Sequence, residues 1–526
     1  MCKARCPSMC PNRGSIRRSL GYGVVFSYSW LLFFTGCQNT SDPSQAGYWI
    51  KRLDKRTERV EALKHLGRIG DKSAVPAVLK WFKEEGTWQP DAAYALGQLG
   101  DPSVVKDLIA GIDYSSLSDN MLGRNKARTN VNIVRALALL KTPESGEPIL
   151  KLFERGDART REVCLQALGE LGSKYTDFLM KAALEDKDPG VRLAAVKALG
   201  NLGDAKAVPV LVEMLFVNMN DGSSFYESAY QALIQIGAPS IPELEKTLAR
   251  KNGSVEKLTQ TDKAVTEEVI VVKTAAVLGS LQATSATDAL LAQLAKFYPR
   301  AKQNEMAASV AIELAYALGN IGGDKVIAAL SPMAKDNDPN LRTAACEALS
   351  TLGARQIVPD MIAAAKSGDL GGRRAAIIAA SRLGSGAALA DFDALAKVGG
   401  SPDEVEAMGE LVAMERVRLV AAQECGSEGN CWAAKLKDNN ERVRERAAYE
   451  LGWLSQKDKI NDLLKAAEDD DPQVRIAAVL SLSRLGGADA KQLQAIYDQW
   501  HAKMDYAGAN KELLLLIARS KNANKK

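Results

Sequence analysis

Residues 188–203 read DPGVRLAAVKALGNLG, and altered copies of this stretch recur along most of the 526-residue chain. Its apolar residues return every three or four positions, which is typical of an amphipathic helix, and its final glycine favours a helix C-cap. Seven other clear copies are RVEALKHLGRIG (59–70), DAAYALGQLG (91–100), REVCLQALGELG (161–172), IELAYALGNIG (312–322), LRTAACEALSTLG (341–353), RRAAIIAASRLG (373–384) and VRIAAVLSLSRLG (474–486). Five weaker copies are VNIVRALALL (131–140), SAYQALIQIG (228–237), VVKTAAVLGSLQ (271–282), DEVEAMGELVAM (403–414) and VRERAAYELGWL (443–454). Successive copies lie mostly about 31 residues apart, and such a period indicates a repeat architecture.

A second amphipathic run follows each copy, and several of these runs carry a proline near their start. Examples are AVPAVLKWF (74–82), AVPVLVEML (207–215), SIPELEKTL (240–248) and IVPDMIAAA (357–365). Proline is tolerated in the first turn of a helix, so each unit is interpreted as two antiparallel helices whose neighbours bury their apolar faces. The sequence therefore predicts an all-α fold, a right-handed α-solenoid of about thirteen helix pairs over residues 48–505, followed by a capping helix and tail at 506–526.

The turn between the paired helices carries the pattern Asp-x-x-x-Arg in five places. The pairs are Asp157/Arg161, Asp188/Arg192, Asp338/Arg342, Asp369/Arg373 and Asp471/Arg475. An aspartate at this point is expected to cap the next helix, and an arginine one turn further can reach an aspartate of an adjacent unit. Because the pattern recurs along the array, whereas a catalytic site would be unique, we interpret these residues as a structural ladder.

These motifs resemble the short HEAT repeats called PBS-lyase-type or HEAT_2 repeats, whose consensus is D-P-x-V-R-x-x-A-x-x-A-L-G-x-L-G. Residues 188–203 match this consensus almost throughout, and the resemblance extends from about residue 51 to residue 500. It implies stacked HEAT-type helix pairs, and it says little about function because one fold serves many functions. HEAT-type bilin lyases and DNA glycosylases exist, so the resemblance leaves an enzyme open.

Positive charge is concentrated at the N-terminus. The chain holds 68 basic and 64 acidic residues, and residues 1–36 contain five of the basic residues and no acidic one. These five are Lys3, Arg5, Arg13, Arg17 and Arg18. The rest of the chain is therefore close to neutral, which argues against a nucleic-acid partner.

The first 36 residues have the form of a signal peptide. Three arginines precede the apolar stretch LGYGVVFSYSWLLFFT (20–35), which is followed by Gly36-Cys37 and a polar run. This arrangement resembles a bacterial lipobox, in which the cysteine is lipidated on sulfur and becomes the new N-terminus. The resemblance implies a lipid on Cys37, a polar tether at 37–47 and a place in the bacterial cell envelope, at the outer membrane facing the periplasm. A plain secretory signal, giving a periplasmic or secreted protein, and a single N-terminal anchor helix are the alternatives.

Two cysteines enclose a glycine-rich segment late in the array. Cys425 and Cys431 flank the sequence GSEGN, and in an exported protein the two could form a local disulfide. Cys164 and Cys346 stand at alanine or valine positions of the repeat, so we expect them to be small core residues.

Four gaps between copies are wider than the rest. Their extra segments are 114–128, 251–267, 297–305 and 424–432. All four are predicted to follow the second helix of one pair and to precede the Leu-Gly helix of the next copy, so they should line one edge of the solenoid. Such an edge is either a binding face or a set of loops that tolerate changes in length.

Residues for common catalytic centres are scarce. Only His65 and His501 occur in the chain, far apart in sequence, and neither a phosphate-binding glycine loop nor a nucleophile elbow is found. HEAT-repeat di-iron hydroxylases carry several His-Glu pairs that this chain lacks. We therefore predict no catalytic residue, no metal site, no cofactor and no small-molecule substrate.

Three functional hypotheses follow. The favoured one is a lipid-anchored scaffold that binds protein partners on its concave face or along the insertion edge. The second is an enzyme or enzyme subunit, similar to the bilin lyases, that uses a groove lined by the insertions. The third is a periplasmic glycan-binding protein in which tryptophans stack on sugars, although we interpret these tryptophans as core residues. They are Trp81, Trp88, Trp432 and Trp453.

Overall fold

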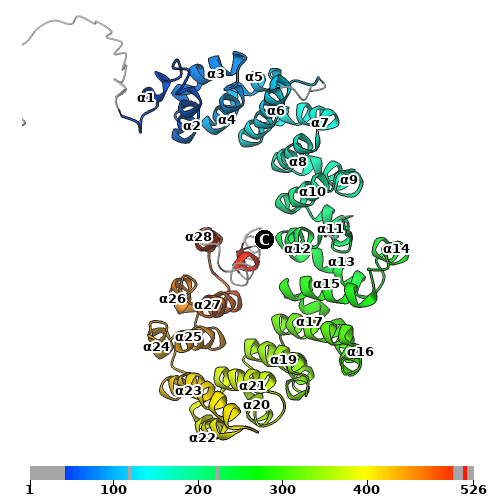
Figure 1. The fold of residues 1–526 in the computed structure, drawn as a ribbon, viewed down its shortest axis with the longest axis vertical. Helices are drawn as coiled ribbons and strands as arrows, with labels where there is room; N and C mark the ends of the chain where they lie inside the picture. The colour runs from blue at the N-terminus through cyan, green and yellow to red at the C-terminus, as the bar shows by residue number, and fades with distance from the viewer. Residues whose placement is uncertain (1–41, 116–120, 220–223, 502–512, 518–519, 521–526) are drawn as a thin grey trace, which may run out of the picture.

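The computed structural model describes residues 42–115, 121–219, 224–501, 513–517 and 520. Helix pairs stack side by side in these residues, and the stack curves into an open ring (Figure 1). The expected all-α solenoid is therefore confirmed. The predicted signal peptide and Cys37 lie outside the described residues.

Thirteen helices form the inner layer of the ring, one for each repeat copy in the sequence. They are α2 (Arg59–Ile69), α4 (Gln89–Leu99), α6 (Met121–Leu140), α8 (Ala158–Leu171), α10 (Pro189–Leu202), α12 (Tyr226–Ile236), α15 (Glu267–Ser280), α17 (Glu305–Ile321), α19 (Pro339–Leu352), α21 (Leu370–Leu383), α23 (Pro402–Cys425), α25 (Glu441–Trp453) and α27 (Pro472–Leu485). Consecutive members of this series pack against one another.

The second helices of the pairs form the outer layer. They are α3 (Val75–Lys83), α5 (Val105–Ala110), α7 (Gly146–Arg155), α9 (Thr176–Glu185), α11 (Val208–Met214), α13 (Ile241–Leu248), α16 (Thr287–Phe297), α18 (Asp324–Leu330), α20 (Val358–Ala364), α22 (Leu389–Ala394), α24 (Gly429–Lys435) and α26 (Ile460–Ala466). Three further helices are α1 (Ala46–Ile50), α14 (Gly253–Thr261) and α28 (Ala490–His501). Each pair buries leucine, valine and alanine side chains between its own helices and those of its neighbours.

The two glycines of the repeat motif have different roles. Gly100 ends α4 with φ of 67°, the left-handed conformation that a C-cap requires. Gly97 lies within α4, and a Cβ atom placed on it would stand 2.4 Å from the Cα of Ala136 in α6. The first glycine therefore permits the close approach of inner helices, a role that the sequence analysis did not assign to it.

Three of the four insertions lie at the predicted edge, between an outer helix and the following inner helix. The first extends α6 at its N-terminus, the second forms α14 and the third forms a short 3-10 turn before α17. The fourth prediction is wrong, because α23 runs without interruption to Cys425 and segment 424–432 joins this inner helix to the outer helix α24. Residues 403–425 contain no proline beyond the first turn to end the helix earlier. The fourth insertion therefore lies at the opposite edge of the solenoid.

The ring folds back on itself near its C-terminal end, where α25 and α27 lie beside α19 and α21 (Figure 1). Trp453 Nε1 and Arg484 Nη2 both donate to the carbonyl oxygen of Thr351, at 3.3 and 2.8 Å. Arg446 of α25 donates to the carbonyl oxygen of Ser381, at the end of α21, at 2.9 Å. Units of a regular solenoid contact only their neighbours, so these bonds across intervening helices fix a tighter curvature here.

The described part of the predicted C-terminal capping helix spans residues 513–517 and lies inside the ring (Figure 1). Leu515 is buried in the apolar cluster formed by residues 46–419, whereas Leu516 is buried in the cluster that begins at Ala421. This short segment therefore contacts both parts of the curved array.

Replacing Gly97 with alanine should loosen the contact between α4 and α6. The new methyl group would overlap main-chain atoms of α6, so we expect a loss of about 1–2 kcal/mol in the free energy of unfolding despite the better helix propensity of alanine. Urea denaturation followed by circular dichroism measures this change. Gly253→Ala is the matched control, because nothing lies within 4 Å of the added atom. Equal stability of the two variants would contradict the role assigned to Gly97.

Candidate partner-binding surface

All five aspartates of the predicted ladder cap an inner helix. Each lies in the turn from the outer helix of one pair to the inner helix of the next pair, so their expected place between the two helices of one pair is wrong. Asp188 Oδ1 accepts hydrogen bonds from the N–H groups of Gly190 and Val191, at 2.9 and 3.2 Å. The other four accept N–H groups in the same way: Asp157, Asp338, Asp369 and Asp471. Each carboxylate also lies at the positive end of a helix dipole. The capping role of these aspartates is confirmed.

Most arginines of the ladder donate to main-chain carbonyl oxygens, and fewer of them pair with an aspartate. Arg161 does pair with Asp186 of the adjacent unit, through bonds of 3.1 and 3.0 Å. Arg342 instead donates to the carbonyl oxygens of Asp336 and Ala364, at 2.8 and 3.3 Å. Other arginines that donate to carbonyl oxygens are Arg192, Arg373 and Arg475.

The expected arginine–aspartate contact is therefore wrong for Arg192, Arg342 and Arg373. The physical reason lies at the ends of the outer helices, where the last carbonyl oxygens have no partner within the helix. A guanidinium suits these oxygens and the negative end of the helix dipole. The turn thus places a carboxylate at the start of one helix and a cation at the end of the other, which makes the ladder structural.

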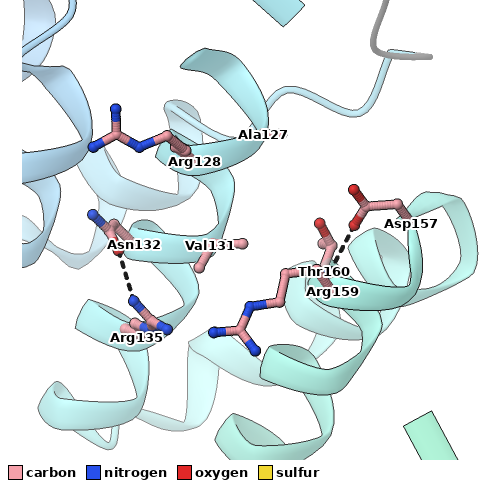
Figure 2. A pocket seen from close by; sticks show the side chains of 8 residues that line it. All are labelled: Ala127, Arg128, Val131, Asn132, Arg135, Asp157, Arg159 and Thr160. Atoms are coloured by element: carbon pink, nitrogen blue, oxygen red, sulfur yellow. Dashed lines mark hydrogen bonds between the residues drawn. The ribbon is translucent and has the colours of Figure 1, made fainter. Parts of the chain in front are cut away.

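The exposed face of the inner layer is hollowed between α6 and α8. The hollow has a volume of about 310 Å³, and Figure 2 shows the side chains that line it. They are Ala127, Arg128, Val131, Asn132, Arg135, Asp157, Arg159 and Thr160. Figure 2 shows Arg159 reaching from α8 toward Arg135 of α6, with Arg128 further up the same helix. Three of the eight lining residues are arginines, so we call this site the arginine hollow.

The arginine cations are only partly neutralised. Arg159 pairs with Glu162 at 3.0 Å, but the Arg159 side chain is 63% exposed, so this ion pair is weak. Arg135 donates to Asn132 Oδ1 at 3.3 Å. Arg128 is exposed, and among the described residues it forms neither a hydrogen bond nor an ion pair. The three guanidinium groups outnumber the nearby Asp157 and Glu162 carboxylates, so the hollow can hold an anionic group.

A second hollow, of about 200 Å³, continues the first one along the same two helices. Arg135 lines both hollows, and the second also contains Tyr94, Leu139 and Glu170. Tyr94 and Leu139 are 38% and 51% exposed, so this end of the furrow presents open apolar surface. We call the two hollows together the α6–α8 furrow. One end of this furrow is cationic and the other end is apolar.

A third hollow, of about 390 Å³, lies between α15, α17 and α19 and is bordered by Ile476 of α27. Tyr316 donates to Glu347 there at 2.9 Å. Burial and the Glu347 carboxylate raise the pKa of the Tyr316 hydroxyl, so it stays protonated at neutral pH. Because these two groups satisfy each other and α27 borders the hollow, it offers less open surface than the α6–α8 furrow.

A cluster of buried ion pairs holds α21, α23 and α25 together. Glu445 is 1% exposed and pairs with Arg382 at 2.7 Å and with Arg418. Arg418 also pairs with Glu415, which accepts a hydrogen bond from Ser381 at 2.7 Å. Buried charges are costly unless they are paired, so this set of opposite charges constrains how the three helices meet.

A second buried pair lies beside this cluster in α25. Arg446 and Glu450 are both 1% exposed and are joined by Nη2–Oε1 contact at 2.5 Å. Burial lowers the pKa of Arg446 to about 10, so the guanidinium remains charged at neutral pH. Arg355, from the turn after α19, pairs with Glu450 as well. The pair therefore takes part in the fold-back of the ring.

A departure from the repeat consensus marks this cluster in the sequence. In the regular copy, Ala198 precedes Leu199-Gly200, whereas Glu450 occupies the same position before Leu451-Gly452. A charge at a small-residue position of the repeat indicates a local change of packing. The arginine hollow has a similar signal, because Arg159 stands one repeat period before Gly190.

The cysteines occupy the positions that the sequence suggested. Cys425 and Cys431 form a disulfide with Cα atoms 5.4 Å apart, which closes the loop between α23 and α24. Cys164 and Cys346 are buried, and burial raises the pKa of both thiols to about 12. Both thiols are therefore protonated and unreactive near neutral pH.

The tryptophans of the glycan hypothesis are packed within the fold. Trp432 is fully buried, and Trp81 and Trp88 hold the guanidinium of Arg59 at 3.4 and 4.3 Å from their rings. Trp453 is half-buried over the end of α19. These environments leave little ring surface for a sugar.

The histidines and acidic residues are dispersed. His65 stacks on Trp49 with ring centroids 3.9 Å apart, and His501 ends α28 at the far end of the array. Across the described ranges, no group of three or more His, Cys, Asp or Glu side chains is placed to hold a metal ion. None of the described helices combines the length and the apolar character needed to cross a bilayer.

A family model for HEAT repeats matches residues 147–222, 176–260, 294–382, 335–408 and 432–503, which together cover more than half of the chain. The chain belongs to the HEAT-repeat family. A PBS lyase HEAT-like repeat also matches residues 91–114, within the part that holds α4 and α5. HEAT-repeat solenoids are suited to protein–protein interaction because their stacked units present a long curved surface. No curated protein matches this HEAT-repeat chain in sequence.

Solved structures resemble this HEAT-repeat protein in fold alone. Importin beta, crystallised from ammonium sulfate, is 13% identical with a TM-score of 0.44, covering 89% of this chain and 70% of its own. Yeast importin-beta (Kap95p) is 13% identical with a TM-score of 0.44, covering 87% and 68%. The complex of CpcE and CpcF of phycocyanin lyase from Nostoc sp. PCC7120 is 19% identical with a TM-score of 0.27, covering 38% and 79%.

Replacing Glu445 with glutamine should destabilise the C-terminal part of the array. The change leaves Arg382 buried without its carboxylate and leaves Arg418 with Glu415 alone, so we expect a loss of roughly 3 kcal/mol at pH 7. Urea unfolding followed by tryptophan fluorescence measures it, since Trp432 and Trp453 lie in this region. Glu410→Gln, at an exposed position of the neighbouring helix α23, is the control and should change little.

The effect of Glu445→Gln should depend on pH. Burial alone would raise the pKa of the Glu445 carboxyl, but Arg382 and Arg418 outweigh it and the net shift is downward. A lowered pKa in the folded state contributes stability that is complete above the unfolded-state value of about 4.3 and is lost as the pH falls further. The gap between wild type and variant should therefore narrow below about pH 4. A gap that is constant with pH would contradict the ionised state of Glu445.

Proposed function

We propose that this protein is a non-catalytic scaffold that binds a protein partner along the α6–α8 furrow and is held at the bacterial cell envelope by a lipid on Cys37. The observation that carries the binding role is the furrow itself, where exposed arginines lie next to exposed apolar side chains on the inner face. Arginine and tyrosine are enriched at protein interfaces, because each combines a large contact area with directional hydrogen bonds.

The inner face favours a partner for a geometric reason. Consecutive inner helices line one curved side of the ring, so a partner can contact several units at once (Figure 1). Tyr94, Leu139 and Arg135 come from two neighbouring helices of this surface, α4 and α6. The outer helix α9 carries Leu184, which is 37% exposed and lies away from the furrow.

The envelope location rests on the leader of the chain. An apolar stretch ends at Gly36-Cys37 and gives way to a polar run, which resembles a lipobox and its tether. The Cys425–Cys431 disulfide is in keeping with export, because disulfides persist in oxidising compartments.

A photo-crosslinking amino acid at position 139 tests the binding face. Introduced in place of Leu139 in cells of the native host, it should give a discrete adduct with a partner protein, because this side chain lies exposed in the furrow. The same amino acid in place of Leu184 should give none. Gel mobility and mass spectrometry of the adducts measure the outcome. Adducts from position 184 alone, or identical adducts from both positions, would contradict binding at the furrow.

Radiolabelled palmitate tests the anchor. The wild-type protein should incorporate the label and Cys37→Ala should not, since the thiol is the acceptor of the lipid in the proposed modification. The double variant Cys425→Ala/Cys431→Ala should keep the label. Label retained in Cys37→Ala, or absent from wild type, would exclude a lipid on this residue.

A further inference from the structure

We infer that the furrow binds an extended acidic segment of its partner, with carboxylates in the arginine hollow and a large apolar side chain over Leu139. This inference rests on the proposed function, because it names the chemistry of the partner at the same furrow. It follows from the order of groups along α6, where Arg128, Arg135 and Leu139 succeed one another.

The cationic end favours carboxylates. Arg128, Arg135 and Arg159 line one hollow, and Arg159 reaches toward Arg135 across it (Figure 2). A guanidinium can bind a carboxylate through two parallel hydrogen bonds. Only Glu162 pairs with any of the three among the described residues. Within the described ranges the hollow therefore has cationic groups without a paired carboxylate.

The apolar end favours a large side chain. Tyr94, Leu139 and Ala138 line the second hollow together with Val163 and Ala167. Covering the exposed parts of Tyr94 and Leu139 would remove apolar surface from water, at about 25 cal/mol per Å². A leucine, methionine or phenylalanine of the partner has the size to do so.

The distance between the two ends sets the length of the segment. Arg128 and Leu139 are about 16 Å apart along α6, at roughly 1.5 Å per helical residue. An extended chain covers roughly 3.3 Å per residue, so about five residues span the furrow. The segment thus has acidic residues up to about five positions from its apolar residue.

Two features of the lining disfavour a nucleic acid. Glu170 adds a carboxylate to the apolar end of the furrow, which would repel a phosphate backbone running through both hollows but not a short segment whose carboxylates reach only the arginine hollow. Outside the N-terminal leader the chain has no excess of basic residues. A short segment that pairs acidic with apolar residues fits this mixed lining better.

A random peptide library displayed on phage tests the inference on the full-length protein. Selected peptides should combine two or more acidic residues with one large apolar residue up to about five positions away. Synthetic fluorescein-labelled copies of them should bind in fluorescence anisotropy. The triple variant Arg128→Glu/Arg135→Glu/Arg159→Glu should weaken binding by more than about tenfold, as lost charge-assisted bonds require.

A matched variant controls for net charge. Lys106→Glu/Lys181→Glu/Lys187→Glu changes the same number of exposed basic residues away from the furrow, and it should bind like wild type. Leu139→Ser should weaken binding by about fivefold and relax the selection for the apolar residue. Circular dichroism of each variant checks the fold, and Arg128→Gln/Arg135→Gln/Arg159→Gln replaces the triple glutamate variant if that one does not fold.

Three results would overturn the inference. They are a library without binders, selected peptides that lack acidic residues, and equal binding by the two charge-reversed variants. Tight binding of a single-stranded oligonucleotide that is lost in the arginine variant would assign the hollow to a phosphate backbone instead. The crosslink from position 139 is independent of these three results, because a folded partner surface in the furrow would also give the crosslink. If no acidic peptide binds, the proposed function therefore still stands.

Discussion

The close approach of neighbouring inner helices is the contact on which the rest of this structure depends. Gly97 allows α4 to lie against Ala136 of α6, and Gly200 allows the same approach of α10 to Ala232. We call this contact between neighbouring inner helices the seam. A helix pair cannot bury its apolar face alone, so each unit is stable only through the seam. The seam also sets what remains exposed, because residues that face away from both neighbours form the inner surface of the ring.

The Asp-Arg turn completes the array at its edges. Each ladder aspartate satisfies the first N–H groups of an inner helix, and most ladder arginines satisfy the last carbonyls of an outer helix. Both groups act on helix ends, where partners within the helix are missing. The Asp-x-x-x-Arg pattern therefore stabilises helix ends. The residues that we propose to bind a partner lie elsewhere, on the exposed face of α6 and α8.

Repeat period, glycine caps and apolar spacing were enough to predict the solenoid, its thirteen inner helices and the aspartate caps. They could not predict that α23 continues without interruption to Cys425. The residues between 403 and 425 are compatible both with one long helix and with a shorter helix followed by a loop, and only packing against neighbouring helices decides between the two. They also could not show that Arg128, Arg135 and Leu139 share one furrow, since that depends on how α6 and α8 are rotated about their axes. The buried ion pairs of Glu445 and Glu450 became interpretable only when the fold-back of the ring brought α25 beside α21.

The C-terminal and N-terminal units of the array have different roles, the first in fixing its curvature and the second in binding a partner. The C-terminal units are fixed by buried charges and by bonds across the ring, while the N-terminal units leave their cations and apolar groups exposed. Hydrogen–deuterium exchange of the full-length protein, with and without a selected acidic peptide, tests this account most directly. The account predicts slower exchange in residues 121–140 and 158–171 and unchanged exchange in the outer helices α7 and α9. Protection confined to the outer helices, or to the repeats after residue 400, would contradict it.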